Sequence, residues 1–330
     1  MKPARHTLRI LVAASLSSCL AVGAHAQSSV NIYGLVDLSV GTTKAPGGTS
    51  TTALSSGKMT TSYLGFSGSE DLGGGLSAVF RIEGFMRVDS GATGRFDADT
   101  TWSRTSSVGL SSKTLGTLTL GRNTTSLFVN TLMYNALGDS FGYSPSIRHY
   151  FTSGTVTGDT GWSQSLAYSS PTFGGFRGGF AATSRTGNGS NVAFNLNYGE
   201  GPFSAGLAAQ QVKKDTATTS LDDTRTVQLG MAYDFGAAKV YGQLGTVKNL
   251  STENSYDIAG VGVRVPLGGG ALVAQYGSLS PDVGADRDTL SVGYVYNLSK
   301  RTDVYVVAMS DKVDGLSSGN GASVGMRHRF

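Results

Sequence analysis

The feature that most constrains this chain is a two-residue alternation of apolar and polar side chains, which returns in many segments. In residues 226–235 every second side chain is apolar, namely Val227, Leu229, Met231, Tyr233 and Phe235. Residues 191–198 and 290–299 alternate in the same way. Successive side chains of a β-strand point to opposite faces, so each segment is expected to be a strand with one apolar and one polar face. The alternation therefore predicts an all-β fold.

The expected strands are long, which favours a membrane-spanning barrel over a soluble β-sandwich with the same alternation. They run for about 9 to 12 residues, as a tilted strand needs to cross a bilayer, whereas about 5 to 6 is usual in soluble sheets. Their polar faces are rich in Gly, Ser, Asn and Thr, which suits a water-filled interior. No segment after residue 26 is an apolar run long enough for a membrane-spanning helix. We therefore expect an antiparallel transmembrane β-barrel.

Counting the alternating segments predicts sixteen strands. They are expected to begin near Val30, Tyr63, Leu76, Arg104, Thr117, Gln164, Phe176, Asn191, Phe203, Thr224, Ala238, Tyr256, Ala271, Asp288, Thr302 and Gly321. Longer polar loops are expected at about residues 41–60, 213–223 and 281–287. The longest gap without alternation covers residues 123–161, between the fifth and sixth strands. In residues 304–309 both faces are apolar, so the pattern leaves the orientation of that strand open.

The first 26 residues have the pattern of a secretory signal peptide. A basic region, a short apolar stretch and a small-x-small cleavage site follow one another, as Lys2, Arg5 and Arg9, residues 8–22, and Ala24-His25-Ala26. We expect residues 1–26 to be removed, which leaves one barrel domain of residues 27–330. Residues 16–19 also resemble a lipobox, so a lipid on Cys19 is an alternative. An uncleaved membrane anchor is disfavoured because serines interrupt the apolar stretch.

Removal of the leader changes what the composition implies. The leader holds three of the 26 basic residues, none of the 22 acidic ones, and Cys19, which is the one cysteine of the sequence. The mature chain is therefore nearly neutral, which gives no support to nucleic-acid binding. Without a cysteine it can form no disulfide, no thiolate nucleophile and no cysteine metal site.

Residues that could carry catalysis or bind a metal are sparse. The mature chain has two histidines, His149 and His328, which lie far apart in the sequence. A Ser-His-Asp hydrolase that uses His149 is therefore an alternative with little support. Asp282, Asp286 and Asp288 form an acidic segment, but their spacing is not that of an EF-hand loop. We expect no enzymatic activity, no cofactor and no metal site.

The end of the chain alternates up to an aromatic last residue. Arg327 and Arg329 lie on one face of the expected final strand, whereas Met326, His328 and Phe330 lie on the other. A last strand that ends in an aromatic residue is characteristic of outer-membrane barrels, whose assembly machinery reads it. We therefore expect Phe330 to be an assembly signal and the chain to reside in the outer membrane.

Six segments, found in order along the chain, carry a family resemblance. They are SVNIYGLVD at 29–37, GFSGSEDLGGGL at 65–76, SVGL at 107–110, GTLTLGR at 116–122, SPTFGGF at 170–176 and GMRHRF at 325–330. Together they resemble the general diffusion porins of Gram-negative bacteria, of the betaproteobacterial type, over the whole mature chain. The resemblance implies a 16-stranded barrel that assembles as a homotrimer among outer-membrane lipid and lipopolysaccharide. It also implies passive diffusion of small hydrophilic solutes and ions, through a pore that the third extracellular loop narrows. Residues 123–161 lie where that loop should be.

The charges of such a constriction can be sought by alternation. In the third expected strand Arg81 and Glu83 alternate with apolar residues and are expected to face the lumen, because a charge facing lipid near the midplane costs about 2–4 kcal/mol. In the expected loop Asp139 is the acidic candidate, and Arg148 is a weaker basic one. The resemblance implies a transverse field between arginines of the wall and an acid of the loop.

The resemblance also bears on three positions of the wall. It implies that Arg122 lies on the basic side of the constriction, although alternation with Leu118 and Leu120 points it outward. Arg104 matches a family arginine, but alternation points it outward too, so it is a weaker candidate. Tyr63 stands where similar porins carry an arginine, and alternation points it into the lumen. With one arginine fewer, we expect a mild anion preference or near neutrality.

The residues leave two other functions open. A substrate-specific outer-membrane channel would carry a run of aromatic residues along the lumen, whereas the inward positions that alternation identifies are mainly small. A surface adhesin barrel would carry long loops, whereas most of the expected loops have only a few residues. Passive diffusion is therefore the favoured function.

Overall fold

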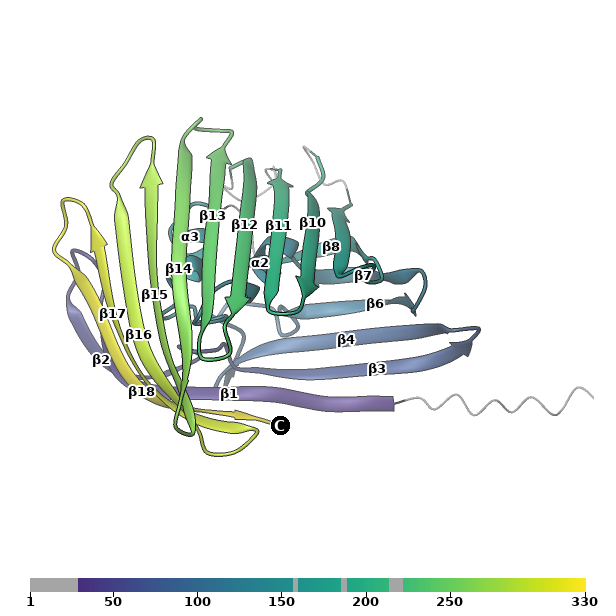
Figure 1. The fold of residues 1–330 in the computed structure, drawn as a ribbon, viewed down its shortest axis with the longest axis horizontal. Helices are drawn as coiled ribbons and strands as arrows, with labels where there is room; N and C mark the ends of the chain where they lie inside the picture. The colour runs from purple at the N-terminus through teal and green to yellow at the C-terminus, as the bar shows by residue number, and fades with distance from the viewer. Residues whose placement is uncertain (1–28, 157–159, 185–188, 214–221) are drawn as a thin grey trace, which may run out of the picture.

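The alternating segments form the strands of an antiparallel barrel in a computed structural model, with one loop folded into its interior (Figure 1). The structure describes residues 29–156, 160–184, 189–213 and 222–330. The predicted signal peptide and its cleavage site lie outside these residues. Within the described ranges, neither helix is long and apolar enough to cross a membrane.

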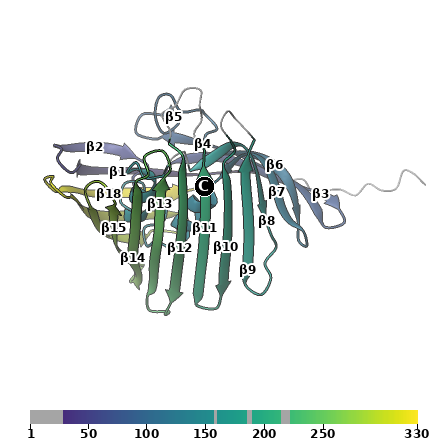
Figure 2. The same cartoon turned by 90° about the horizontal axis from the view of Figure 1, so that it is seen from above.

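The elements follow one another mostly as antiparallel hairpins. Their bounds are β1 Ser29–Lys44, β2 Ser50–Ser56, β3 Tyr63–Gly73, β4 Leu76–Arg87, β5 Ala92–Thr93, β6 Thr105–Ser112, β7 Gly116–Thr124, α2 Ser126–Met133, α3 Pro145–Phe151, β8 Gly161–Ser169, β9 Phe176–Thr183, β10 Val192–Glu200, β11 Phe203–Val212, β12 Thr224–Asp234, β13 Lys239–Asn249, β14 Ser255–Leu267, β15 Gly270–Pro281, β16 Arg287–Asn297, β17 Thr302–Val313 and β18 Gly319–Arg329. Figure 2 shows β9 to β15 side by side in the wall.

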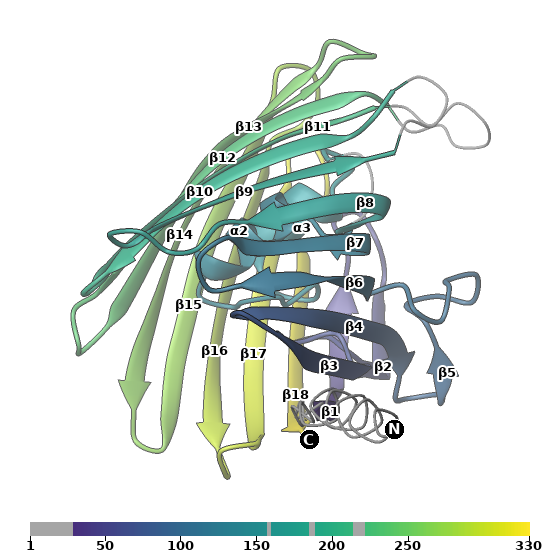
Figure 3. The same cartoon turned by 90° about the vertical axis from the view of Figure 1, so that its right-hand side faces the viewer.

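These segments make the sixteen wall strands that the alternation predicts. β2 and β3 pair with successive parts of β1, so they form one wall strand that is broken at residues 57–62. β5 pairs with the end of β4 and lies outside the wall (Figure 3). β1 also pairs with β18, which closes the sheet into a barrel and leaves no free edge.

The loop predicted at residues 41–60 is wrong. β1 continues to Lys44 and β2 begins at Ser50, so only residues 45–49 connect them. This hairpin is polar on both faces, and the hydroxyls of Thr42 and Thr52 lie 3.0 Å apart across it. A hairpin that extends beyond the membrane meets water on both sides, so its sequence carries no alternation to reveal it. The gap predicted at residues 123–161 is confirmed as the connection between β7 and β8.

The two ends of the barrel differ in their connections. At one end lie the start of β1, the end of β18 and short turns such as residues 113–115 and 201–202. At the other end, longer connections such as residues 88–104 and 125–160 join the strands. In outer-membrane barrels the short turns face the periplasm and the longer loops face the outside of the cell. The end with the short turns is therefore the periplasmic end. Aromatic side chains gather near the periplasmic end as a girdle, namely Phe173, Phe176, Tyr198, Phe203, Tyr233, Phe235, Tyr294 and Tyr296.

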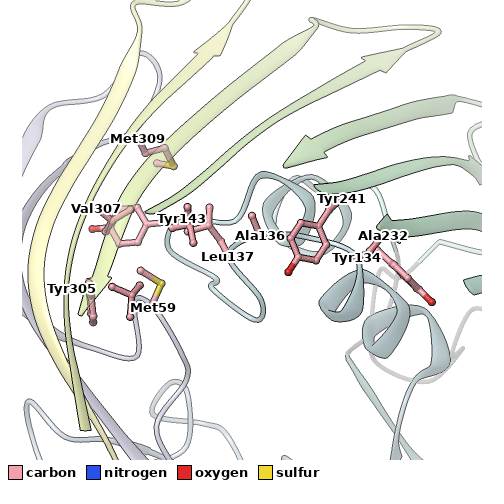
Figure 4. Close-up of a cluster of buried hydrophobic side chains, with 12 residues drawn as sticks. Met59, Tyr134, Ala136, Leu137, Tyr143, Ala232, Tyr241, Tyr305, Val307 and Met309 are labelled. Atoms are coloured by element: carbon pink, nitrogen blue, oxygen red, sulfur yellow. The ribbon is translucent and has the colours of Figure 1, made fainter. Parts of the chain in front are cut away.

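The buried apolar core lies inside the barrel, between the inward loop and the wall (Figure 4). It consists of Met59, Tyr134, Ala136, Leu137, Tyr143, Ala232, Tyr241, Val273, Val295, Tyr305, Val307 and Met309. This core settles the orientation of residues 304–309. Tyr305 and Val307 face the loop, whereas Val306 is 50% exposed on the outer face. The strand is apolar on both faces because one face meets lipid and the other meets the loop.

Candidate pore constriction

The connection between β7 and β8 turns into the barrel over residues 125–156, here called the constriction loop. Figure 3 shows its helices behind β7 and β8. Helix α2 contacts β10, β11 and β12, whereas α3 contacts β14, β15 and β16. Each helix begins at a hydroxyl cap: Thr125 accepts a hydrogen bond from the N–H of Phe128, and Ser144 accepts one from the N–H of Ile147. The cap at Thr125 directly follows β7, so α2 begins where the strand ends.

Glutamines of the inner wall hold the first half of the loop by amide hydrogen bonds. Gln228 on β12 accepts a hydrogen bond from Nδ2 of Asn130 at 2.8 Å and donates one to the hydroxyl of Thr131 at 2.9 Å. Gln243 on β13 donates to the carbonyl of Thr131, also at 2.9 Å. These amides are buried, so their hydrogen bonds specify where the helix lies as well as stabilise it.

A third glutamine repeats this arrangement for the second half of the loop. Gln275 on β15 accepts a hydrogen bond from the N–H of Ala136 at 2.9 Å and donates one to the hydroxyl of Ser146 at 2.7 Å. Further along, Ser291 on β16 donates to the carbonyl of Tyr143 at 2.6 Å. The loop is thus bonded to successive strands of the wall.

One carboxylate of the wall also holds the loop by charge. Asp311 on β17 is 1% exposed, and its Oδ2 lies 2.7 Å from Nη2 of Arg148 and 2.6 Å from Nη2 of Arg287. Beside it, Nε2 of His149 lies 2.9 Å from the hydroxyl of Thr289, which donates to Asp311 at 3.0 Å. Burial and the nearby Arg287 lower the pKa of His149 to about 4, so its ring is neutral at neutral pH.

Glycines of the inner wall give the loop room to pack. A Cβ at Gly230 would lie 2.6 Å from Cγ of Tyr134, and a Cβ at Gly277 would lie 2.8 Å from Cβ of Pro145. Side-chain atoms do not approach so closely, so any larger residue at these positions would displace the loop. The wall therefore carries glycines where the loop places large side chains against it.

The tip of the loop meets the break between β2 and β3. The N–H of Gly142 donates a hydrogen bond to the carbonyl of Lys58 at 3.1 Å. Asp37 on β1 holds the same segment from the wall, because its Oδ2 accepts the N–H of Thr60 at 2.8 Å. The interruption at residues 57–62 thus lets the wall strand turn inward toward the loop.

A cavity of about 520 Å³ lies between the loop and the wall. Among the residues that the structure describes, its charged lining consists of four arginines and one acid, Arg104, Arg264, Arg327, Arg329 and Asp139. The loop contributes residues 132–133 and 135–139, and the wall contributes Tyr63 and Tyr241. This cavity has the mixed charge and the inward loop that a pore constriction requires.

The acid of the loop is connected to the wall through one hydroxyl. Oδ1 of Asp139 accepts a hydrogen bond from Thr60 at 3.0 Å, and the same hydroxyl oxygen of Thr60 accepts one from Nη1 of Arg327 at 2.9 Å. Burial raises the pKa of Asp139, against the opposing effect of Arg104 and Arg327.

The guanidinium of Arg104 is held by a carboxylate on its edge and by aromatic rings on its face. Its Nε lies 3.1 Å from Oε2 of Glu83, whose Oε1 accepts a hydrogen bond from the hydroxyl of Tyr33 at 2.6 Å. Its Cζ lies 4.3 Å from the centre of the Tyr63 ring and 5.6 Å from that of Phe85. Neither terminal nitrogen has a hydrogen-bond acceptor in the described part of the chain, so both can meet a solute.

Two of the other arginines share one carboxylate. Oδ1 of Asp303 lies 2.9 Å from Nε of Arg327, and its Oδ2 lies 3.2 Å from Nη1 of Arg329. Arg264 lines the cavity without a carboxylate partner among the described residues. The basic side of the cavity is therefore partly neutralised.

The structure brings together several of the predicted constriction residues. Tyr63 and Asp139 line the cavity, and Glu83 lies behind it as the partner of Arg104. Arg104 itself, the weaker candidate, lines the cavity as well. Alternation gave it the wrong direction because β6 begins only at Thr105, so Arg104 precedes the ladder that would fix its side chain.

Three predicted residues do not reach this cavity. Arg81 lines a separate cavity of about 530 Å³ along β3, β4, β6 and β7. Arg148 holds the loop through its ion pair with the wall. Arg122 lies where β7 ends, and its Nη1 donates to the carbonyl of Gly161 and the hydroxyl of Ser163, each at 3.0 Å, so the role that the resemblance implied stays a prediction.

Three arginines of the cavity were missed, although the sequence carried a signal for each. Alternation already separated Arg327 and Arg329 from the apolar face of the last strand. Arg264 likewise alternates with Val261, Val263 and Val265, so it points inward. Alternation gives the direction of a side chain but not its depth in the barrel, and depth decides which lumen residues meet the loop.

Comparisons with known proteins agree with this architecture. A sequence profile of the Gram-negative porin family matches residues 11–316. The chain is 32% identical to outer membrane porin protein 32 of Delftia acidovorans over 93% of this chain and 95% of that one. The structure of an anion-selective porin from Comamonas acidovorans superposes with a TM-score of 0.78 at 28% identity, over 92% and 100% of the two chains. The trimer form of OmpT from Vibrio cholerae shares the fold, with a TM-score of 0.69 at 13% identity over 92% and 99%.

The chain therefore belongs to the family of Gram-negative porins. It is a channel of the outer membrane, and small hydrophilic solutes cross it by passive diffusion. The family and these relatives are channels rather than enzymes.

Proposed function

We propose that this porin has a mild preference for anions, set at the cavity between the constriction loop and the wall. The observation that carries the proposal is the charge of the cavity lining, where four arginines face one acid of the loop. Selectivity in a pore follows the sign of the charges at its narrowest part. The name of the Comamonas relative, an anion-selective porin, supports the same sign for this chain.

The preference is mild because carboxylates offset most of the arginines. Glu83 pairs with Arg104, and Asp303 pairs with Arg327 and Arg329. With Asp139 included, four cations meet three anions, which leaves a small positive excess. Arg104 on the wall and Asp139 on the loop also create a transverse field, which orients dipolar solutes as they pass.

A reversal potential across a KCl gradient tests the proposed preference. The purified chain in a planar bilayer should show chloride as moderately more permeant than potassium. Arg104→Gln should lower the permeability ratio of chloride to potassium by about twofold, because it removes one charge from the cavity. Arg301→Gln, in an exposed turn at the periplasmic end, is the matched control and should change nothing. A strongly cation-selective wild type would refute the proposal.

We further propose that the chain matures by loss of residues 1–26 and assembles as a homotrimer. The loop before β6 supports an interface, because its Trp102 is 42% exposed and packs on Phe66 of the outer wall at a ring distance of 6.0 Å. Phe330 supports recognition by the barrel-assembly machinery, because it pairs with Gly34 and ends the strand that closes the barrel. Mass spectrometry of the native oligomer tests cleavage and stoichiometry together.

A further inference from the structure

The aromatic ring of Tyr63 gives the constriction a chemical feature beyond its charge. Its face carries the guanidinium of Arg104 at 4.3 Å, and it forms a T-shaped pair with the ring of Tyr33, at a centroid distance of 6.2 Å with the planes at 73°. Phe85 lies near the same guanidinium, 5.6 Å from its carbon. Two rings therefore lie against one cation, and Glu83 fixes the edge of that cation. Arg104 is held as a flat surface whose terminal nitrogens are available to a solute.

The constriction loop also contributes apolar residues to the same cavity. Leu132, Met133, Ala136 and Leu137 of the constriction loop all line it, and Met133 is 47% exposed. A methionine side chain is flexible and polarisable, so it adapts to the surface of a passing ring. The lining of this cavity therefore offers a solute both a stacked cation and a thioether.

We propose that Tyr63 is a specificity-determining residue that makes the constriction favour anions with a flat apolar body, such as aromatic carboxylates, over compact anions of the same charge. The proposal rests on the anion preference proposed above and specifies which anions bind most strongly at the constriction. A carboxylate head can accept hydrogen bonds from the terminal nitrogens of Arg104, as any small oxyanion can. Only a solute with a flat ring adds stacking against Tyr63 and Arg104, because guanidinium and aromatic planes stack on one another.

Block of single-channel chloride current tests this specificity. Benzoate, cyclohexanecarboxylate and acetate carry the same charge, but only benzoate has a flat ring. We expect benzoate to reduce the chloride current at a concentration about threefold lower than cyclohexanecarboxylate requires, and acetate to be the weakest. Tyr63→Phe keeps the ring and should keep this order. Tyr63→Leu keeps an apolar side chain without a ring and should bring benzoate and cyclohexanecarboxylate together.

The chloride current of each variant shows that its pore is open, so a loss of benzoate block cannot be mistaken for misfolding. Equal block by benzoate and cyclohexanecarboxylate in the wild type would overturn the proposal, and so would an unchanged difference in Tyr63→Leu. The reversal potential separates the two claims. A pore that prefers anions but does not distinguish benzoate refutes the role of Tyr63 alone, whereas a cation-selective pore refutes the proposed function.

Discussion

Arg148 of the constriction loop and Asp311 of β17 form an ion pair, with Nη2 of the arginine 2.7 Å from Oδ2 of the aspartate. The same carboxylate accepts hydrogen bonds from Arg287 of the wall. A loop residue and a wall residue therefore depend on one acid. Loss of that buried acid would leave both arginines without a carboxylate partner among the residues that the structure describes.

Replacement of this acid should loosen the constriction loop without opening the barrel. Asp311→Asn is expected to weaken docking of the loop by about 3 kcal/mol, the usual cost of breaking a buried ion pair. The measurement is current noise in planar bilayers together with protease cleavage within the loop. Asp314→Asn, an exposed residue just beyond β17, is the control. A quiet, protease-resistant Asp311→Asn pore would show that the glutamine hydrogen bonds suffice.

Added volume at the wall beneath α2 should also disturb the loop. Gly230→Ala is expected to destabilise the folded protein by about 1–3 kcal/mol, because its Cβ would overlap the ring of Tyr134. Thermal unfolding and pore conductance would both report the change. Gly242→Ala provides the comparison, since a Cβ there meets nothing within 4 Å. Similar behaviour of the two variants would argue against tight packing of the loop.

The raised pKa of Asp139 predicts how selectivity responds to acid. The carboxylate is charged above its pKa, and burial places that pKa above the value of about 3.9 for an exposed aspartate. As the pH falls, the cavity therefore loses its loop anion early, and the preference for anions should increase. Reversal potentials measured from neutral to mildly acidic pH test this in the wild type and in Asp139→Asn. The variant should show high anion preference throughout and a much flatter response.

Much of the barrel, but less of the constriction, could be predicted from the sequence. Alternation gave the wall strands and the inward direction of Arg81 and Arg327, because lipid and lumen impose it on each strand locally. It could not give the role of Arg104, whose position depends on Glu83 and Tyr63 from other strands. Nor could it give the partners of Arg122, because these lie on the far side of the constriction loop, at Gly161 and Ser163.

The pKa of His149 predicts that docking of the loop weakens in acid. Burial keeps this pKa at about 4, below the value of about 6.5 for an exposed histidine. The folded state therefore resists protonation, so the stability from this residue is complete above about pH 6.5 and falls by roughly 3 kcal/mol as the pH approaches 4. The charged groups around the ring are Arg148, Arg287 and Asp311.

Thermal unfolding at neutral and mildly acidic pH tests this linkage. His149→Gln can still form a hydrogen bond with Thr289 but does not titrate, so it should lose less stability than the wild type on acidification. Equal losses in the two proteins would assign the acid response to other groups.

The porin is a water-filled pore that a docked loop narrows, and liposome swelling tests this most directly. Liposomes that contain the purified porin are placed in solutions of neutral sugars of increasing size, and the swelling rate is recorded. We predict that the rate falls steadily with solute size, is equal for stereoisomers and rises in proportion to concentration. A single sugar that enters far faster than its isomers, with a rate that saturates, would contradict passive diffusion and indicate a substrate-specific channel.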